Sequence, residues 1–442
     1  MPASRVQVLD KARPLGFWTC WSLTVGIMIG SGIFLLPSVL APYGLIGFSG
    51  WVVTTAGSIC LALIIARLAS RTSRSGGVYA YAHDAFGNLT GFLVAWGYWA
   101  AYWIAMPAMA IAFVGYLGVF IPALETQPLA QAGVALALIW AITLINMKGL
   151  REASLVQVAM TILKLIPLLV IILLAGVAGT PQNLPEANPS DGAFLPIVAA
   201  TALLTMWAFS GLEAGTISAG NVKNPERTVP RAILIGTITV ALIYIASTIA
   251  VMLLVPAETL VTSTKPFADA ASHLGSWGPA LIAIGAMIST AGALNGTVYV
   301  AGQLPIAVAL DGLAPRRLTE TGEKKTSGLA LILAASLASI LLLFNYTRGL
   351  VGLFTFLIMM STLAILVPLF VSALAELRHS WKSQKAWALI GILGLIYSAF
   401  TMLGSGLAVL AWGLLLFAAG LPVYLLGRQR SPHEDTTGQA TS

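Results

Sequence analysis

Charged side chains are scarce in this sequence. Only 9% of its 442 residues are Asp, Glu, Lys or Arg, and 58% are hydrophobic, whereas a soluble globular domain has about 25% charged residues. The longest polar stretches are 178–193, 256–276, 311–327 and the tail after 427, and each is too short to form a domain of its own. The composition excludes a soluble protein and indicates an integral membrane protein.

Cysteine is also nearly absent. Cys20 and Cys60 both lie in apolar runs, where we expect small packing side chains rather than a disulfide. The histidines are scattered without the spacing of metal ligands: His83, His273, His379 and His433. The sequence therefore predicts neither a metal site nor a cofactor.

Apolar runs of membrane-spanning length fill most of the chain, and we count about twelve. Their spans are 16–40, 44–69, 88–121, 130–147, 154–177, 194–219, 229–255, 277–310, 328–344, 349–375, 386–403 and 405–427. None shows the alternating pattern of a membrane barrel. We therefore predict an all-α integral membrane protein with twelve transmembrane helices.

The basic residues follow a topological pattern. Of 23 lysines and arginines, only Lys164, Lys265 and Arg348 fall outside the termini, the even-numbered loops and the span edge at Arg67. By the positive-inside rule both termini face the cytoplasm, as in a multi-pass protein of the inner (cytoplasmic) membrane. The net charge of +7 is thus a topology signal and implies the lipid bilayer, not nucleic acid, as partner. We expect no cleaved signal peptide. The sequence leaves open whether the protein forms a homodimer.

Two of the predicted spans contain several glycines, which weaken a helix. The first contains G-I-M-I-G-S-G-I-F (26–34), and the sixth contains W-A-F-S-G-L-E-A-G (207–215). Glycine-interrupted segments at corresponding positions of two halves are the best sequence pointer to the binding site of a secondary transporter. The two segments are five spans apart, and a repeat unit with an odd number of spans must be inverted in the membrane when it recurs.

The chain is accordingly predicted to be a single transporter domain covering 1–442. The first inverted repeat covers 16–177 and the second covers 194–375. Two trailing helices occupy 386–427, and the polar tail 428–442 is expected to be disordered.

Interrupting a helix inside the membrane frees backbone groups, which is tolerated only where they are buried or line a polar cavity. The N-terminus of the second half-helix would offer amides and partial positive charge to a carboxylate. Carbonyls at the other broken end would suit an ammonium group, so the pair could bind both ends of an amino acid. The alternative is that these small residues only let helices pack closely.

Two ionisable residues lie well inside spans, Lys164 and Glu213, and each costs about 2.5–3.5 kcal/mol on insertion scales. Glu213 could bind a substrate ammonium, close a gate or carry a proton; the alternative is a carboxylate that only caps free amides. Lys164 could be a fixed cation in the site or pair with carbonyls; the alternative is that it reaches for the membrane interface.

Large side chains near the breaks are candidates for the pocket wall, with lipid-facing or packing roles as the alternative: Met28, Met106, Met109, Trp207 and Phe209. A membrane enzyme would need a cluster of catalytic groups at one depth, which two isolated charges do not supply. A receptor would more often carry an extramembrane domain. A transporter is the function that we predict.

Several motifs together carry a family likeness: G-S-G-I-F-L-L-P (30–37), S-G-G-V-Y-A-Y (75–81), W-A-F-S-G-L-E (207–213), N-V-K-N-P-E-R-T-V-P-R-A (221–232) and D-G-L-A-P (311–315). With them the chain resembles the amino acid, polyamine and organocation transporter superfamily. The resemblance is greatest to its basic amino acid/polyamine antiporter branch, which includes the arginine/agmatine antiporter. It implies two inverted five-helix repeats with helices 1 and 6 discontinuous, plus two C-terminal helices, working by alternating access.

The resemblance also implies roles for individual residues. The broken first span, with Gly30, Ser31 and Gly32, would hold the substrate carboxylate. Carbonyls from Trp207 to Ser210, before the break at Gly211, would meet the amino group. Trp207 would stack on the substrate, Glu213 would serve gating or proton coupling, and Lys164 would replace a sodium ion.

Departures from the branch bear on the substrate. Met106 and Thr297 stand where the arginine/agmatine antiporter has a substrate-contacting asparagine and tryptophan, and Ser361 is placed on the far wall. With Met28 and Met109 these changes give a softer, less polar pocket. We therefore predict a sodium-independent amino acid transporter, working by exchange or proton coupling and favouring a neutral or apolar amino acid. The alternative, supported by Glu213, is an antiporter of basic amino acids or polyamines.

Overall fold

The computed structural model describes residues 16–71, 77–148, 154–212, 225–314, 318 and 327–427, and the described part of the chain is helical without strands. The longer helices are α1 (Phe17–Met28), α2 (Gly32–Leu40), α3 (Phe48–Arg71), α4 (Val78–Phe86), α5 (Asn88–Leu117), α6 (Pro128–Met147), α7 (Ser154–Ala178), α8 (Phe194–Phe209), α9 (Pro225–Leu254), α12 (Gly278–Leu310), α13 (Gly328–Asn345), α14 (Leu350–Ser380), α15 (Lys385–Leu403) and α16 (Gly406–Gly427).

Each predicted span coincides with helical structure, within a few residues where its ends are described. Among the described residues, nine helices are long and apolar enough to cross a membrane. Two further apolar helices, Ile162–Ala178 and Phe194–Phe209, are shorter. The all-helical membrane architecture is therefore confirmed.

The first predicted span is broken. Helix α1 ends at Met28, and Ile29 takes an extended conformation (φ −77°, ψ 93°) before α2 starts at Gly32. Gly30 and Ser31 lie in the break and Gly32 begins α2, and residues with so little side-chain bulk let the chain change direction. The interruption expected from the sequence is present at the expected place.

The helix of the sixth predicted span ends before the span does. Helix α8 ends at Phe209, Ser210 is extended (ψ 135°) and Gly211 has φ +96°, which favours glycine because it has no Cβ. Glu213 lies outside the described residues, as does the rest of the span up to 219.

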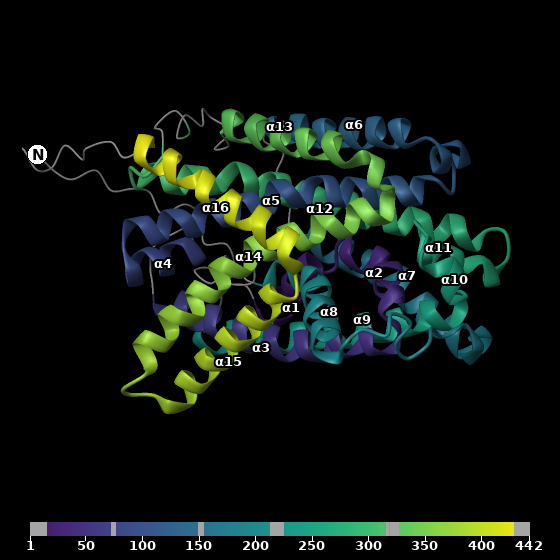
Figure 1. Ribbon diagram of the computed structural model, residues 1–442, viewed down its shortest axis with the longest axis horizontal. Helices are drawn as coiled ribbons and strands as arrows, with labels where there is room; N and C mark the ends of the chain where they lie inside the picture. The colour runs from purple at the N-terminus through teal and green to yellow at the C-terminus, as the bar shows by residue number, and fades with distance from the viewer. Residues whose placement is uncertain are drawn as a thin grey trace, which may run out of the picture.

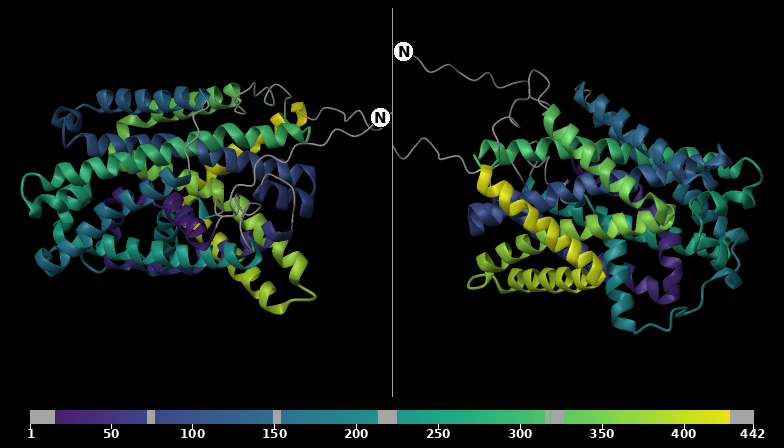
Figure 2. Two further views of the ribbon diagram at one scale, coloured as in Figure 1. Left: turned by 180° about the vertical axis from the view of Figure 1, so that it is seen from behind. Right: turned by 45° about the horizontal axis from the view of Figure 1, so that its top comes forward.

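Several of the long helices, among them α5, α6 and α12, run along one axis of the bundle (Figure 1). Helix α5 runs through the middle of the bundle and contacts α12 and α14, while α6 and α13 lie together on one side. Helix α1 packs against α7 and α9. Helices α15 and α16 lie diagonally in Figure 1, and the right-hand view of Figure 2 shows α16 crossing the bundle at an angle.

Short helices not expected from the sequence lie at the two ends of the bundle. Helix α4 is at one end of the long axis, and α10 (Ala257–Leu260) with α11 (Pro266–Ala270) is at the other (Figure 1). The sequence predicts only a polar connection over 256–276, because helices as short as α10 and α11 leave no periodic pattern in it. Cys20 and Cys60 are free thiols, as expected.

Candidate functional site

A cavity of about 690 Å³ lies at the break between α1 and α2. It is bounded by α1, α2, α5, α6, α7, α12 and the end of α8. Of the residues singled out in the sequence, those that line it are Met28, Gly30, Ser31, Gly32, Met109, Lys164, Trp207 and Ser210. Segments separated by almost 180 residues in the chain thus meet around one space.

The carbonyl groups at the end of α1 have partners from other helices. The last carbonyls of a helix lack intrahelical donors. Tyr244, on α9, donates its hydroxyl to the Met28 carbonyl at 2.7 Å, and the Lys164 ammonium donates to the Gly26 carbonyl at 3.2 Å. These two bonds stabilise the broken end without closing the cavity.

The start of α2 provides the opposite chemistry. Gly30, Ser31 and Gly32 line the cavity, and the first amides of a helix have no intrahelical acceptor. The Ser31 hydroxyl is 1% exposed and has no hydrogen-bond partner among the described residues. Free donors and the positive end of the helix dipole together suit a carboxylate.

Lys164 projects into the protein. It is 7% exposed, and a Cβ built on Gly292 of α12 would lie 3.9 Å from its Nζ. Pro167, on the same helix, packs so closely on Gly285 that a Cβ there would lie 2.5 Å from Cγ. The tight packing of α7 on α12 directs the ammonium to α1, so the alternative of a lysine reaching for the interface is wrong.

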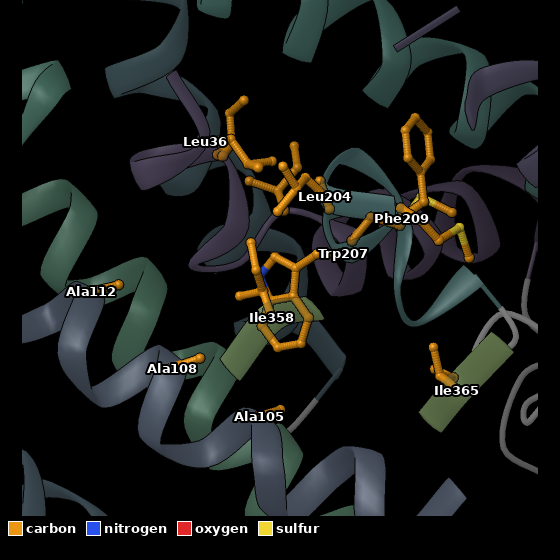
Figure 3. Packing of buried hydrophobic residues seen from close by; sticks show 14 of the residues in the cluster. Leu36, Ala105, Ala108, Ala112, Leu204, Trp207, Phe209, Ile358 and Ile365 are labelled. Carbon is orange, nitrogen blue, oxygen red and sulfur yellow. The ribbon is translucent and has the colours of Figure 1, made fainter. Parts of the chain in front are cut away.

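Trp207 closes the side of the cavity formed by α8. Its indole is 5% exposed, and a Cβ added to Gly32 would lie 2.8 Å from its Cδ1. In Figure 3 the indole extends from α8 in the direction of the α5 face that carries Ala105, Ala108 and Ala112. These small side chains leave room for the ring.

Two of the residues placed at the site pack in the core instead. Met106 is fully buried away from the cavity. Phe209 packs between Trp51 and Tyr244, with ring centroids 6.1 and 6.0 Å apart. Met109 lies three residues, about one turn, further along the same helix, and it lines the cavity, whereas Met106 does not.

Three more candidates are not among the residues that line the cavity. Ser361 donates its hydroxyl to the Ala101 carbonyl at 2.7 Å, which joins α14 to α5. The Thr297 hydroxyl donates to the sulfur of Met109, which lines the cavity, at 3.3 Å. Gly211 follows Ser210 and supplies only the positive φ of the turn.

Sequence reasoning missed Asn295, which lines the cavity from α12. Its Oδ1 accepts a 2.8 Å hydrogen bond from Nδ2 of Asn146 on α6. Because Oδ1 is engaged, the Nδ2 group of Asn295 is the part left to donate to a ligand. An asparagine beside a glycine within an apolar span was the available signal.

The charge of the cavity wall is positive where it is described. Lys164 is the one ionisable residue among the described lining residues, and the rest of the wall is small, apolar or neutral. No group of metal-ligating side chains is found among the described residues. Glu213 follows Leu212 directly but lies outside the described residues.

A cavity at a helix break, with helix ends and one fixed charge facing it, is typical of a secondary transporter. The amino acid permease family model matches residues 15–424. The chain therefore belongs to the amino acid permease family, and it is a transporter rather than an enzyme.

Curated relatives fall in the basic amino acid and polyamine branch. The cadaverine/lysine antiporter of Escherichia coli is 31% identical over 90% of this chain and 91% of its own length. The arginine/ornithine antiporter of Pseudomonas aeruginosa is 30% identical over 93% of this chain and 90% of its own length. The putrescine transporter of Haemophilus influenzae is 29% identical, with 94% and 97% covered.

Proposed function

We propose that the protein exchanges basic amino acids or polyamines across the membrane by alternating access, without sodium. The observation that carries the proposal is the cavity at the break between α1 and α2, in a chain whose relatives are antiporters of such substrates. Their substrates favour this proposal over the neutral amino acid that the pocket residues alone suggested.

In this proposal the broken helices bind the common part of the substrate. The amides at Gly30 to Gly32 and the Ser31 hydroxyl would receive a carboxylate, and carbonyls at the end of α8 would receive an ammonium group. Trp207 would cover the bound substrate. The chain would cross the membrane twelve times as two inverted repeats and two trailing helices, with both termini in the cytoplasm.

Lys164 would make sodium unnecessary. Its ammonium binds a carbonyl at the broken end of α1, and carbonyls freed by an unwound helix are the ligands that bind coupling ions in other transporters. A fixed cation at this place supplies the same positive charge in every transport cycle.

A neutral amino acid is the second candidate. The side-chain wall is soft and apolar at Met28, Met109, Ile142, Ile145 and Ile288. Such a wall suits an aliphatic side chain better than an ammonium, which costs free energy to remove from water unless it is paired.

Counterflow in proteoliposomes distinguishes the two candidates. Vesicles are prepared in sodium-free buffer and loaded with lysine, arginine, ornithine, cadaverine, putrescine or leucine. A labelled form of one of these six compounds is then added outside the vesicles. Uptake that requires an internal basic amino acid or diamine supports the proposal. Uptake driven only by internal leucine supports the second candidate, and no exchange with any of the six contradicts both.

Thermal unfolding of the purified protein provides an independent check of binding. A ligand that binds only the folded state raises the apparent stability by about 2.7 kcal/mol at one hundred times its dissociation constant. We expect this rise with the same compounds that support exchange.

A further inference from the structure

A second hollow lies on a different part of the bundle from the substrate cavity. It is a groove of about 370 Å³ between α5, α12, α13 and α16. Its walls include Trp96 and Trp99 of α5, Val308 of α12, Leu333 and Leu337 of α13 and Val423 of α16. The substrate cavity and this groove share α5 and α12 but no lining residue.

Every lining side chain in the described part of the chain is apolar, and the polar atoms of the two tryptophans are engaged elsewhere. The Trp96 indole N–H donates to the Leu416 carbonyl at 2.8 Å. The Trp99 indole N–H donates to the Ala301 carbonyl at 3.1 Å. An occupant of the groove thus finds neither a donor nor an acceptor in these side chains, and only a hydrocarbon fits without leaving a buried polar group unpaired.

The groove opens towards the bilayer. Leu329 and Leu333 of its α13 wall are each 44% exposed, and Leu310 next to it is 72% exposed. Large exposed apolar side chains on membrane-spanning helices face lipid tails. Water is therefore not the natural occupant.

The depth of the groove corresponds to one leaflet. Leu337 lies about 14 Å along α13 from the helix start at Gly328, taking 1.5 Å per residue. Half of the hydrocarbon core is about 15 Å thick. The α12–α13 connection carries Arg316, Arg317, Lys324 and Lys325 in the sequence, which puts this end of the groove in the cytoplasmic leaflet.

We propose that the groove is a binding site for one acyl chain of a cytoplasmic-leaflet phospholipid. The composition of the protein's own C-terminal tail argues against the tail as the occupant of the groove. Residues 428–442 are R-Q-R-S-P-H-E-D-T-T-G-Q-A-T-S and include no large aliphatic side chain. A second copy of the protein remains the rival occupant that the experiment must separate.

The test is cross-linking of the full-length protein in vesicles of phosphatidylethanolamine and phosphatidylglycerol that contain a phospholipid with a photoactivatable acyl chain. Adducts are mapped by peptide mass spectrometry. We expect them to concentrate on the groove segments of α5, α12 and α13 rather than on the other exposed faces of α13.

Leu333→Trp is the blocking variant, because the larger side chain enters the mouth of the groove. The indole takes up space that the acyl chain would otherwise fill, so groove adducts should fall clearly below the wild-type level. Ile332→Trp is the matched control, since Ile332 is 40% exposed on the same helix but does not line the groove. It should leave the adducts unchanged.

Other outcomes overturn the proposal. Adducts spread evenly over every lipid-facing side of α13 would mean that the groove does not bind a chain. Protein–protein cross-links through the groove would make a second copy the occupant. If Leu333→Trp does not yield folded protein, Leu337→Trp replaces it, and the wild-type adduct map alone still decides between enrichment and an even spread.

Discussion

The ammonium group of Lys164 on α7 donates a hydrogen bond to the carbonyl oxygen of Gly26 on α1, with a nitrogen to oxygen distance of 3.2 Å. The bond joins two helices that are far apart in the sequence, close to the point where α1 ends. Because Lys164 is 7% exposed, this contact is screened little by solvent.

Replacing Lys164 should impair transport strongly. In Lys164→Met the side chain keeps its length and loses its charge, so the Gly26 carbonyl loses a charge-assisted hydrogen bond worth about 1.5–3 kcal/mol. We expect the exchange rate to fall about tenfold or more, measured as initial counterflow. Lys382→Met, at an exposed site after α14, is the control; equal rates for the two variants would contradict a role for Lys164.

The approach of α2 to α8 gives a second prediction. In Gly32→Ala the new methyl group would lie 2.8 Å from Cδ1 of Trp207, and overpacking of this kind costs about 1–3 kcal/mol. We expect slower exchange from Gly32→Ala and partial recovery when Trp207→Phe is added.

Trp207→Ala should also weaken exchange, through the loss of stacking and gating.

For Gly32→Ala, the control for adding a methyl group is Gly133→Ala, because no atom lies within 4 Å of the Cβ added there. If the exchange rate does not recover in the Gly32→Ala, Trp207→Phe double variant, the contact with Trp207 is not the reason why Gly32→Ala slows exchange.

A buried ion pair predicts a stability effect. The carboxylate of Glu376 is fully buried, 3.4 Å from Nη1 of Arg67 and 3.2 Å from Nη1 of Arg71. Glu376→Gln removes the charge that both guanidinium groups face, and breaking a buried pair in this way costs about 3 kcal/mol. We expect a lower apparent Tm in detergent.

Arg71→Gln is the comparison for that variant. The Arg71 side chain is 28% exposed, so its pair with Glu376 is partly screened, and Arg67 still neutralises the carboxylate. A Tm loss for Arg71→Gln as large as that for Glu376→Gln would be incompatible with Glu376 as the centre of the cluster.

Asp269, in the short helix α11 outside the spans, predicts a dependence on pH. Burial raises the pKa of its carboxyl above the usual value, while the Ser263 hydroxyl at 2.5 Å and the nearby Lys265 oppose that rise. The folded protein thus holds this proton more tightly than the unfolded chain does. The resulting stabilisation is complete below pH 3.8 and is lost as the pH rises through the raised pKa.

Asp269→Asn tests that sign, because the amide stays neutral at every pH. The Tm of the wild type relative to Asp269→Asn should fall as the pH rises from below 3.8 to neutral. A difference that grows in favour of the wild type over this range would reverse the assignment.

Glu213 remains a prediction from the sequence, since it lies outside the described residues. If this glutamate carries the proton or senses pH, Glu213→Gln should flatten the pH profile of exchange. Glu258→Gln on α10, away from the cavity, should leave the profile unchanged. A Glu213→Gln profile that matches the wild type would remove the proposed proton role.

The sequence predicts the break in the first span better than it predicts the residues of the pocket wall. The break was predictable because glycine in a helix interior costs about 1 kcal/mol relative to alanine. Three glycines and a serine within nine residues (24–32) therefore weaken a continuous helix there. Lys164 was predictable as an inward residue because a charge facing lipid is costly.

The pocket wall was not predictable residue by residue. Helices α5 and α12 are apolar on all sides, so no hydropathy pattern tells which face meets the cavity. The sequence could not separate Met109, which lines the cavity, from Met106, which is buried beside it, nor prefer Asn295 to Thr297.

The sequence by itself determined a helical membrane transporter with an interrupted first helix, because composition, span length and glycine placement are local properties. Only the tertiary structure decided that Lys164, Tyr244 and Asn295 meet that interruption and that Phe209 and Ser361 serve packing. Those facts depend on the rotation of each helix about its axis, which packing against the neighbouring helices fixes.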